Sequence, residues 1–422
     1  MNIKIYPSKV SGEVTIPPSK SMAHRAIICA SLAKGTSIIT NIDYSNDIIA
    51  TIKGMERLGA EIIPQNNSLI IKGTDDFSLF NKRVIDCNES GSTLRFFIPI
   101  FSLTNKKITF KGKNRLMYRP QKIYKDIFSK QNLLFEQSEE KISIKGSLKP
   151  GYYEINGDIS SQFISGLLFT LPLLESDSTI KIIPPFESKS YVNLTIDVLK
   201  NFGINVYFQD ENTIYIKGKQ KYSPCNYTVE GDFSQLGFFA VLGTINSSVK
   251  CNGLNTDSLQ GDKEIIDILK KCGSNILVEK NGYIFSPNIS KGIKIDLANC
   301  PDLGPILMIL AMFGKGDFHL YNAKRLRYKE SDRIDAMESE LKKLGVDIHS
   351  DEDNIYVKGG KNYSTSEILS GQKDHRIVMS LSIAATMCTC PISISGIEAI
   401  FKSYPNFFKD LKKLGVKYEL FE

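Results

Sequence analysis

The residues whose types suggest chemistry stand in short clusters rich in hydroxyl, amide and cationic side chains. The clusters are Pro17-Pro-Ser-Lys-Ser-Met-Ala-His-Arg25, Ser160-Ser-Gln-Phe163, Lys329-Glu-Ser-Asp-Arg333 and Asp374-His-Arg376. Ser21 and Arg25 are four residues apart, which places them on one face of a helix. Lysine and arginine side chains, together with backbone N–H groups at helix starts, bind phosphates and carboxylates. The clusters therefore predict the binding of anionic small molecules.

Each cluster by itself also has an ordinary structural explanation. A Ser-Ser-Gln run is typical of a plain helix N-cap, and the run from Lys329 to Arg333 fits a surface ladder of ion pairs. Prolines rather than glycines precede Lys20, so this segment is not a phosphate-binding P-loop. The elements that carry the clusters must therefore decide between the two explanations.

These elements recur about every 70 residues. Helical segments such as Leu341-Lys-Lys-Leu-Gly-Val346 end at Gly59, Gly203, Gly273, Gly345 and Gly415. A sixth copy is expected near residue 131, where Phe128-Ser-Lys-Gln-Asn132 has asparagine at the glycine position. Asparagine is the next-best residue for the left-handed backbone that ends a helix. The chain is therefore predicted to contain six repeats.

Each repeat is predicted to run strand, helix, strand, helix, hairpin. Residues 61–73 and 206–218 are the clearest hairpins, because two apolar runs flank a polar turn. The first helices have polar starts near Ser19–Ser21, Glu89–Ser92, Ser160–Gln162, Asp232–Ser234, Pro301–Asp302 and Asp374–Arg376. Six such N-termini facing one cleft would attract anions, whereas in a solenoid they would be structural caps. The fold class is α/β in both cases.

Composition narrows the class of protein further. The 422 residues include 53 lysines and arginines against 46 acidic residues, a formal net charge of +7. This diluted charge argues against nucleic-acid binding, and no apolar run approaches the roughly 20 residues that span a membrane. The N-terminus lacks a signal-peptide core, and the scattered cysteines and histidines form no metal-ligand cluster. We therefore expect a reduced, cytoplasmic protein without metal or cofactor.

Taken in order along the chain, the clusters resemble those of the enolpyruvyl transferases, from about residue 9 to about residue 416. The likeness is greatest to the branch that uses shikimate 3-phosphate. It implies a two-domain inside-out α/β barrel of six pseudo-repeats, with the active site in the interdomain cleft. Domain one is expected at residues 1–18 plus 231–422, and domain two at 19–230. A monomer is expected.

The resemblance also implies the reaction. The enolpyruvyl group of phosphoenolpyruvate would pass to the 5-hydroxyl of shikimate 3-phosphate through a tetrahedral intermediate, with release of phosphate. Both substrates carry a phosphate and a carboxylate, so the site needs several cations and helix N-termini. No cofactor, nucleic acid or membrane is implied as a partner.

The resemblance assigns roles to individual residues. The expected catalytic residues are Lys20, Asp302, Lys329 and Glu330. The expected ligands of shikimate 3-phosphate are Lys20, Ser21, Arg25, Ser160, Ser161, Gln162, Ser188, Tyr191, Asp302 and Lys329. The expected ligands of phosphoenolpyruvate are Lys20, Gly91, Arg119, Gln162, Arg333, His375, Arg376 and Lys402.

The sequence departs from the family pattern at three positions. Glu89 stands where an asparagine is usual, Ser92 where a threonine is usual, and Arg325 where an uncharged polar residue is frequent. Two alternatives remain open. The sister branch acts on UDP-N-acetylglucosamine and has a reactive cysteine shortly before an Arg-Pro pair, but residues 113–120 contain no cysteine. A catalytically inactive repeat protein that binds anionic metabolites is the second alternative.

Overall fold

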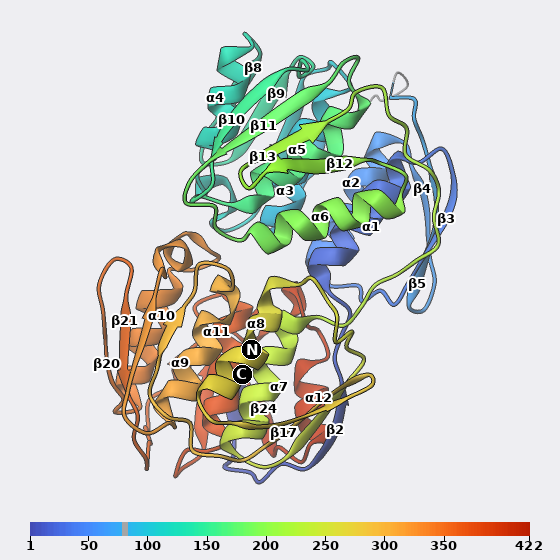
Figure 1. Cartoon of the computed structure of the whole chain (residues 1–422). Coiled ribbons are helices and arrows are strands. Elements are labelled where there is room, and N and C mark those ends of the chain that lie inside the picture. The colour runs from blue at the N-terminus through green and yellow to red at the C-terminus, as the bar shows by residue number, and fades with distance from the viewer. Residues whose placement is uncertain (78–82) are drawn as a thin grey trace. The chain divides into compact units, whose positions relative to one another are not determined.

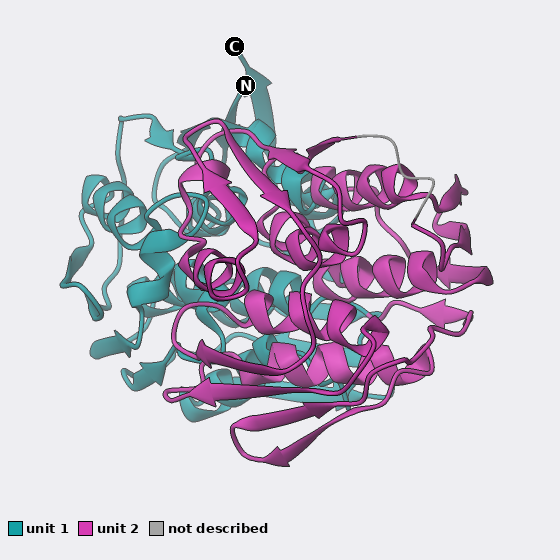
Figure 2. Cartoon of the chain, turned by 90° about the horizontal axis from the view of Figure 1, so that it is seen from above, with its two compact units in different colours: residues 1–17, 231–422 teal, residues 18–230 magenta. Residues whose placement is uncertain are grey.

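The computed structural model describes residues 1–77 and 83–422. This part of the chain divides into two compact units, shown in separate colours in Figure 2. Unit 1 comprises Met1–Pro17 and Gly231–Glu422, and unit 2 comprises Pro18–Glu230. Each unit has its own hydrophobic core, from Ile3 to Val416 in unit 1 and from Met22 to Val229 in unit 2.

Each unit contains three four-stranded sheets built on one plan, and many of their strands are labelled in Figure 1. The third repeat of unit 2 is representative. Its elements are β10 (Tyr152–Asn156), α5 (Ser161–Thr170), η2 (Leu171–Leu173), β11 (Ser178–Ile183), α6 (Lys189–Asn201), β12 (Val206–Asp210) and β13 (Thr213–Ile216). The strand order is β10-β11-β13-β12, and only the first pair is parallel. The predicted order of strands and helices is confirmed.

The other two repeats of unit 2 follow the same plan. The first has α1 (Lys20–Leu32), β3 (Gly35–Thr40), α2 (Asn46–Leu58), β4 (Glu61–Pro64) and β5 (Ser68–Gly73), and β14 (Tyr227–Thr228) completes its sheet. The second has β6 (Val84–Asp86), α3 (Gly91–Ser102), β7 (Ile108–Lys111), η1 (Leu116–Tyr118), α4 (Lys122–Lys130), β8 (Leu134–Gln137) and β9 (Lys141–Lys145).

Unit 1 also contains three repeats of this plan, and the N-terminal segment contributes strands to them. Its first repeat has β2 (Gly12–Thr15), α7 (Phe233–Ile245), β15 (Val249–Asn252), η3 (Gly261–Lys263), α8 (Glu264–Lys271), β16 (Asn275–Glu279) and β17 (Gly282–Ser286). The second has β18 (Lys294–Asp296), η4 (Pro301–Leu303), α9 (Gly304–Met312), β19 (Asp317–Tyr321), η5 (Lys324–Tyr328), α10 (Arg333–Lys343), β20 (Asp347–Ser350) and β21 (Ile355–Lys358). The third has β22 (Leu369–Ser370), α11 (His375–Ala385), β23 (Ile392–Ser395), η6 (Ile397–Lys402), α12 (Phe407–Lys413), β24 (Tyr418–Phe421) and β1 (Asn2–Ile5).

The first helix of each repeat lies inside its unit and the sheets lie outside. Every residue of α9 and α11 is buried, and α7, α9 and α11 pack against one another. In unit 2, α3 packs on both α5 and α1, which are almost fully buried. A helix that is apolar on all sides needs such an interior position. The inside-out arrangement of helices and sheets is therefore present in each unit.

Most of the predicted helix starts are confirmed by side-chain caps. The caps whose oxygens accept backbone N–H bonds are Ser19, Ser90, Ser160, Asp232 and Asp374. The start predicted near Pro301–Asp302 is also found, but as the 3₁₀ turn η4 that runs directly into α9 at Gly304. Pro305 in the first turn of α9 needs no hydrogen-bond acceptor for its nitrogen, and no side chain caps this helix.

The predicted ends of the second helices are also confirmed. The five glycines at the repeat positions all have positive φ angles. Asn132, at the place of the missing glycine, has φ of 56° and is left-handed as expected. The sixth repeat is thus a true repeat with asparagine as its helix terminator.

Candidate active site

A network of buried charges centred on Arg333 joins three helix starts in unit 1. Arg333 Nη1 donates to Asp302 at 2.8 Å, Nη2 donates to Glu330 at 2.8 Å, and Nε donates to Asp374 at 2.8 Å. Nη2 also donates to the second oxygen of Asp374 at 3.3 Å. The Arg333 side chain is only 1% exposed. Four of its five N–H groups are therefore bonded to carboxylates.

The carboxylate of Asp302 pairs with three positively charged side chains of this network. Lys329 Nζ lies 3.0 Å from Asp302 Oδ1, and Arg376 Nη2 lies 3.5 Å from Oδ2. Burial alone would raise the pKa of Asp302. The positive charges of Lys329, Arg376 and Arg333 outweigh burial and hold that pKa well below its usual value. Burial has the opposite effect on the partner and lowers the pKa of Lys329.

Asp374 fixes the start of α11 as well as the Arg333 side chain. One of its oxygens accepts the backbone N–H of Arg376 at 2.9 Å, and the other accepts the Ser331 hydroxyl at 3.1 Å. Burial acts to raise the pKa of Asp374, but the adjacent Arg333 guanidinium more than offsets it, so the pKa is lowered. His375 begins α11 beside this carboxylate and is buried. The carboxylate therefore couples two of the predicted clusters.

The two remaining predicted cations of unit 1 lie in the same network. Arg376 donates to the backbone carbonyl of Asp302 at 3.1 Å and to the hydroxyl of Ser234. Lys402, at the end of η6, places Nζ 3.7 Å from Glu330 Oε1 and is 5% exposed. The structure therefore brings all the predicted residues of unit 1 together. Four cations (Lys329, Arg333, Arg376 and Lys402) meet three carboxylates (Asp302, Glu330 and Asp374), which leaves an excess positive charge.

Arg25 in unit 2 is buried without a carboxylate. Its Nε donates to the Thr195 hydroxyl at 2.7 Å, and its Nη atoms donate to the carbonyls of Ser21 and Tyr191 at 2.7 and 3.2 Å. Within residues 1–77 and 83–422, no carboxylate lies within 4.0 Å of its guanidinium. Burial lowers the pKa of Arg25 to about 10. The side chain remains charged near neutrality, and its neighbours are hydroxyl and carbonyl dipoles and the face of the Phe96 ring, 5.2 Å away, rather than a counter-ion.

Lys20, one turn from Arg25 on α1, has an acidic partner. Its Nζ lies 2.7 Å from Oδ2 of Asp47, whose side chain is 4% exposed. Asp47 is in the first turn of α2, where its charge also interacts favourably with the helix dipole. The ion pair therefore holds the Lys20 ammonium between the starts of two helices.

The start of α3 meets the start of α5 through a set of polar contacts. Gln162 Nε2 donates to the Ser92 hydroxyl at 2.9 Å, and Arg95 Nη1 donates to Gln162 Oε1 at 2.8 Å. A Cβ atom built on Gly91 would lie only 2.6 Å from Arg119 Nη1. The predicted residues Gly91, Arg119 and Gln162 therefore form one cluster.

The other predicted residues of unit 2 lie near the starts of α5 and α6. Ser160 caps α5 and Ser161 begins it, and the Ser161 side chain is buried. Ser188 stands before α6 with a left-handed backbone, φ 53°, and is also buried. The Tyr191 carbonyl accepts the Arg25 bond. Tyr191 thus joins the start of α6 to Arg25, and Ser160 accepts a hydrogen bond from Arg95 Nη1 at 3.4 Å.

The sequence interpretation left out several members of these networks. Asp47, Arg95, Ser234 and Asp374 were not among the predicted ligands. The N-cap positions of Asp374 and Asp232 were visible in the sequence, but the pairing of Asp374 with Arg333 joins residues 41 apart. A contact of that kind depends on tertiary packing and leaves no local signal.

The three departures from the family pattern have local partners. Glu89 accepts a hydrogen bond from Asn114 Nδ2 at 2.6 Å, and Ser92 accepts from Gln162. Arg325 Nη1 donates to the Ala298 carbonyl at 3.3 Å. The Glu89 carboxylate is therefore engaged with the loop before Arg119 in this structure.

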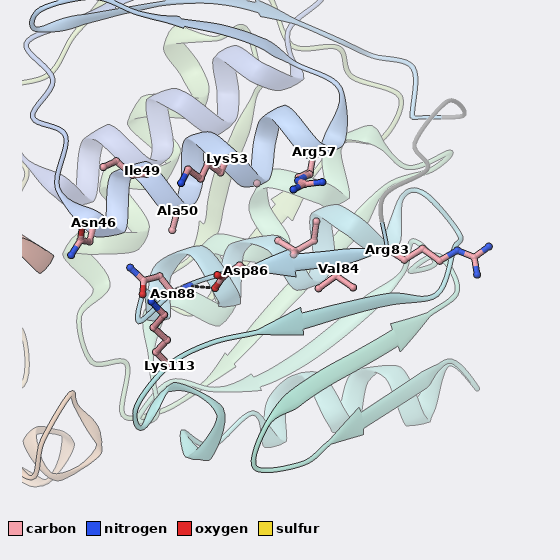
Figure 3. Close-up of a pocket in the computed structure, with 12 residues that line it drawn as sticks. Asn46, Ile49, Ala50, Lys53, Arg57, Arg83, Val84, Asp86, Asn88 and Lys113 are labelled. Carbon is pink, nitrogen blue, oxygen red and sulfur yellow. Dashed lines mark hydrogen bonds between the residues drawn. The ribbon is translucent and has the colours of Figure 1, made fainter.

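A groove of about 800 Å³ lies along α2 and β6 in unit 2 (Figure 3). Lys53, Arg57, Arg83 and Lys113 line it together with the carboxylate of Asp86. These side chains are exposed, and none of the predicted site residues is among those that line the groove. The groove is therefore distinct from the clusters that contain the predicted ligands.

Residues 1–77 and 83–422 contain no group of three or more His, Cys, Asp or Glu side chains that could hold a metal ion. Over the same residues, no helix combines the length and apolar character required to cross a membrane.

The sequence matches one protein family over almost its whole length. Residues 5–411 match the family described as EPSP synthase (3-phosphoshikimate 1-carboxyvinyltransferase). The chain is 47% identical over 415 residues to the 3-phosphoshikimate 1-carboxyvinyltransferase of Clostridium perfringens strain ATCC 13124, and the match covers 97% of each chain. It is 44% identical over 425 residues to the protein of the same name from Clostridioides difficile strain 630, with 98% of this chain and 97% of the relative covered.

Solved structures resemble the chain as well. An EPSP synthase from Acinetobacter baumannii superposes with a TM-score of 0.81 at 25% identity, and 99% of this chain and 100% of the other are covered. The enolpyruvyl transferase NikO from Streptomyces tendae has a TM-score of 0.80 at 14% identity, with 99% and 98% of the two chains covered. The second likeness concerns the fold alone. The fold is thus that of the enolpyruvyl transferases.

Proposed function

Because the chain belongs to the EPSP synthase (3-phosphoshikimate 1-carboxyvinyltransferase) family, we propose that its buried clusters of cations carry out enolpyruvyl transfer. The enzyme transfers the enolpyruvyl group of phosphoenolpyruvate to the 5-hydroxyl of shikimate 3-phosphate and releases phosphate. This reaction is a step of the shikimate pathway to aromatic amino acids. The roles of individual residues are the proposal.

The observation that carries the proposal is the buried, uncompensated charge of Arg25. Burying a cation without a counter-ion is costly, so a site that retains one needs an anionic ligand to offset the cost. We assign the carboxylate of shikimate 3-phosphate to Arg25 and Ser21. The hydroxyls of Ser160, Ser161 and Ser188 are assigned to its phosphate, and Gln162 and Tyr191 are assigned to its ring.

Phosphoenolpyruvate requires a second set of cations. Arg119 and the backbone beside Gly91 are its proposed ligands in unit 2, with Lys20 reaching both substrates. In unit 1 the proposed ligands are Arg333, His375, Arg376 and Lys402. Arg333 has one N–H group beyond its four bonds to carboxylates, so its larger contribution is to hold those carboxylates in place.

Proton transfer is assigned to Lys20, Asp302, Lys329 and Glu330. In the addition step the 5-hydroxyl loses its proton and its oxygen bonds to the enol carbon, while the methylene carbon gains a proton. The product of addition is a tetrahedral ketal phosphate. Elimination removes one proton from the new methyl group and expels phosphate, which restores the double bond.

The charges around Asp302 suggest how substrate binding prepares it for catalysis. Lys329, Arg376 and Arg333 hold its pKa too low for a good base near neutrality. Anionic substrates that bind these cations offset their charge, and this raises the pKa of Asp302. We propose that Asp302 and Lys329 act together on the reacting hydroxyl, and that Glu330 serves the methylene carbon.

The phosphoenolpyruvate assignment is tested with Lys402→Ala. A charge-assisted hydrogen bond contributes about 1.5–3 kcal/mol, so kcat/KM for phosphoenolpyruvate should fall at least about tenfold. The KM for shikimate 3-phosphate should change little. Lys409→Ala, which changes an exposed lysine of α12, is the matched control and should behave as wild type. Wild-type kinetics in Lys402→Ala would remove this residue from the site.

We also propose that the enzyme is a cytoplasmic monomer. All eight cysteines are free thiols, as is usual for a reducing compartment. Sedimentation equilibrium of the purified chain measures the oligomeric state, and a stable dimer would contradict this part of the proposal.

A further inference from the structure

A continuous series of hydrogen bonds between side chains runs through the interior of unit 2. His24 Nδ1 of α1 lies 2.7 Å from the Thr51 hydroxyl of α2. The Thr51 hydroxyl lies 2.7 Å from that of Thr93 in α3, and Thr93 donates to the Ser90 hydroxyl at 2.7 Å. All four side chains are completely buried. Three helices are therefore joined by one buried polar chain.

The geometry fixes the direction of this chain. A hydroxyl group has one proton to donate, and Thr93 donates its proton to Ser90. Thr93 must therefore accept from Thr51. Thr51 has then used its own proton and must accept from His24, whose Nδ1 consequently carries hydrogen. From His24 Nδ1 to the Thr93 hydroxyl, each group donates its hydrogen to the next group in the series.

The chain ends at the helix start that is proposed to bind phosphoenolpyruvate. Ser90 caps α3, and its hydroxyl oxygen also accepts the backbone N–H of Thr93 at 3.1 Å. Gly91 follows immediately, and a Cβ atom there would lie 2.6 Å from Arg119 Nη1. The orientation of the first turn of α3 therefore decides where its N–H groups and Gly91 lie relative to Arg119.

We propose that Thr51 is a positioning residue for phosphoenolpyruvate binding. It touches no substrate and acts through Thr93 and Ser90, which hold the first turn of α3 against α1 and α2. Without the Thr51 hydroxyl, His24 Nδ1–H and the Thr93 hydroxyl each lose a buried partner. The first turn of α3 must then shift or accept unsatisfied polar groups. The inference rests on the proposed role of Gly91 and Arg119.

The test compares steady-state kinetics and melting temperatures of three variants. Thr51→Val keeps the shape and removes the hydroxyl, and Thr51→Ser keeps the hydroxyl. Thr170→Val is the matched control, because Thr170 is equally buried in unit 2 and, among the described residues, its hydroxyl bonds only to the Gly166 carbonyl, at 3.4 Å. Should Thr51→Val fail to fold, Thr51→Ala takes its place with the same expectation.

Thr51→Val should raise the KM for phosphoenolpyruvate about tenfold, since a displacement near 1 Å at a positioning contact has effects of this order or larger. The KM for shikimate 3-phosphate should stay within about twofold of wild type, a change too small to reflect a lost contact. Thr51→Ser should restore phosphoenolpyruvate binding, and Thr170→Val should alter neither constant.

Two results would overturn this inference without contradicting the proposed function. One is a lower melting temperature in Thr51→Val with both Michaelis constants unchanged, which would leave Thr51 a purely structural residue. The other is an equal rise of both constants, which would show a general loosening of unit 2. A wild-type enzyme that releases no phosphate from the two substrates would instead overturn the proposed function, and the inference with it.

Discussion

Arg25 and Arg333 are both almost fully buried, yet their surroundings differ in a way that separates their roles. Arg333 is bonded to three carboxylates, whereas the partners of Arg25 in the described part of the chain are hydroxyls, carbonyls and the Phe96 ring. A saturated guanidinium is suited to organising its neighbours, whereas an uncompensated one is suited to receiving an anion. The family resemblance alone implied that both arginines bind substrate.

A substitution at Gly91 can distinguish a role in phosphoenolpyruvate binding from a purely structural role. Gly91→Ala would place a methyl group 2.6 Å from the end of the Arg119 side chain and 3.8 Å from Gln162 Oε1. The Arg119 side chain is flexible and can move, so the fold should survive. Its displacement should raise the KM for phosphoenolpyruvate while the KM for shikimate 3-phosphate and the melting temperature stay close to wild type.

Kinetics of Gly91→Ala with each substrate varied in turn provide this measurement. If Gly91 is only a flexible link into α3, alanine should be tolerated or slightly stabilising, because it lowers the entropy of the unfolded chain. An unchanged KM for phosphoenolpyruvate would therefore remove Gly91 and Arg119 from the proposed site. An unfolded variant would assign Gly91 to the packing of α3 instead.

Most of the correct predictions about secondary structure concern the ends of helices. Caps such as Ser19, Ser90 and Asp374 depend on a local hydrogen bond, and the left-handed Asn132 depends on its own side chain. Both are encoded within a few residues. The 3₁₀ turn η4 was missed because the polar residue Asp302 resembles a cap, although its side chain pairs with Lys329 and Arg333.

The starts of α10 and α11 should respond to acid through Asp374. Arg333 holds the folded-state pKa of this carboxyl below its usual value of about 3.9, so its contribution to stability is present above that pH. This contribution is lost as pH falls through the lower folded-state pKa. Asp374→Asn can still cap α11 but removes the charge. The variant should be less stable near neutrality.

Melting temperatures of wild type and Asp374→Asn between about pH 7 and pH 2.5 test this expectation. The difference between the two proteins should be large at the neutral end and should shrink below about pH 4. A difference that stays constant over the whole range would show that the Asp374 charge does not contribute to the stability of α11. Asp296→Asn, which changes an exposed carboxylate of β18, serves as the control.

At the scale of the whole molecule, each unit has a complete set of sheets and its own core. No strand of unit 1 is needed to complete a sheet in residues 18–230, because β14 closes the first sheet of unit 2 from within. A polypeptide of residues 18–230 should therefore fold alone with a cooperative thermal transition. Circular dichroism and urea titration of this fragment provide the test.

Residues 231–422 offer the matched comparison, because without residues 1–17 they lack β1 and β2. This fragment should fail to fold cooperatively. Joining Pro17 to Gly231 through a short glycine-serine linker should restore folding, since Asp232 N lies 2.9 Å from the Pro17 carbonyl oxygen. A non-cooperative 18–230 fragment would contradict the independence of the two units, and neither fragment should release phosphate from the substrates.

Phosphate release identifies the acceptor that this chain uses. The NikO likeness, at 14% identity and a TM-score of 0.80, concerns the fold alone and says nothing of the acceptor. The direct measurement is phosphate release by the full chain from phosphoenolpyruvate with shikimate 3-phosphate, and in parallel with UDP-N-acetylglucosamine. Release with shikimate 3-phosphate alone is the predicted result. Turnover only with the sugar nucleotide, or binding of both acids by calorimetry without any turnover, would contradict it.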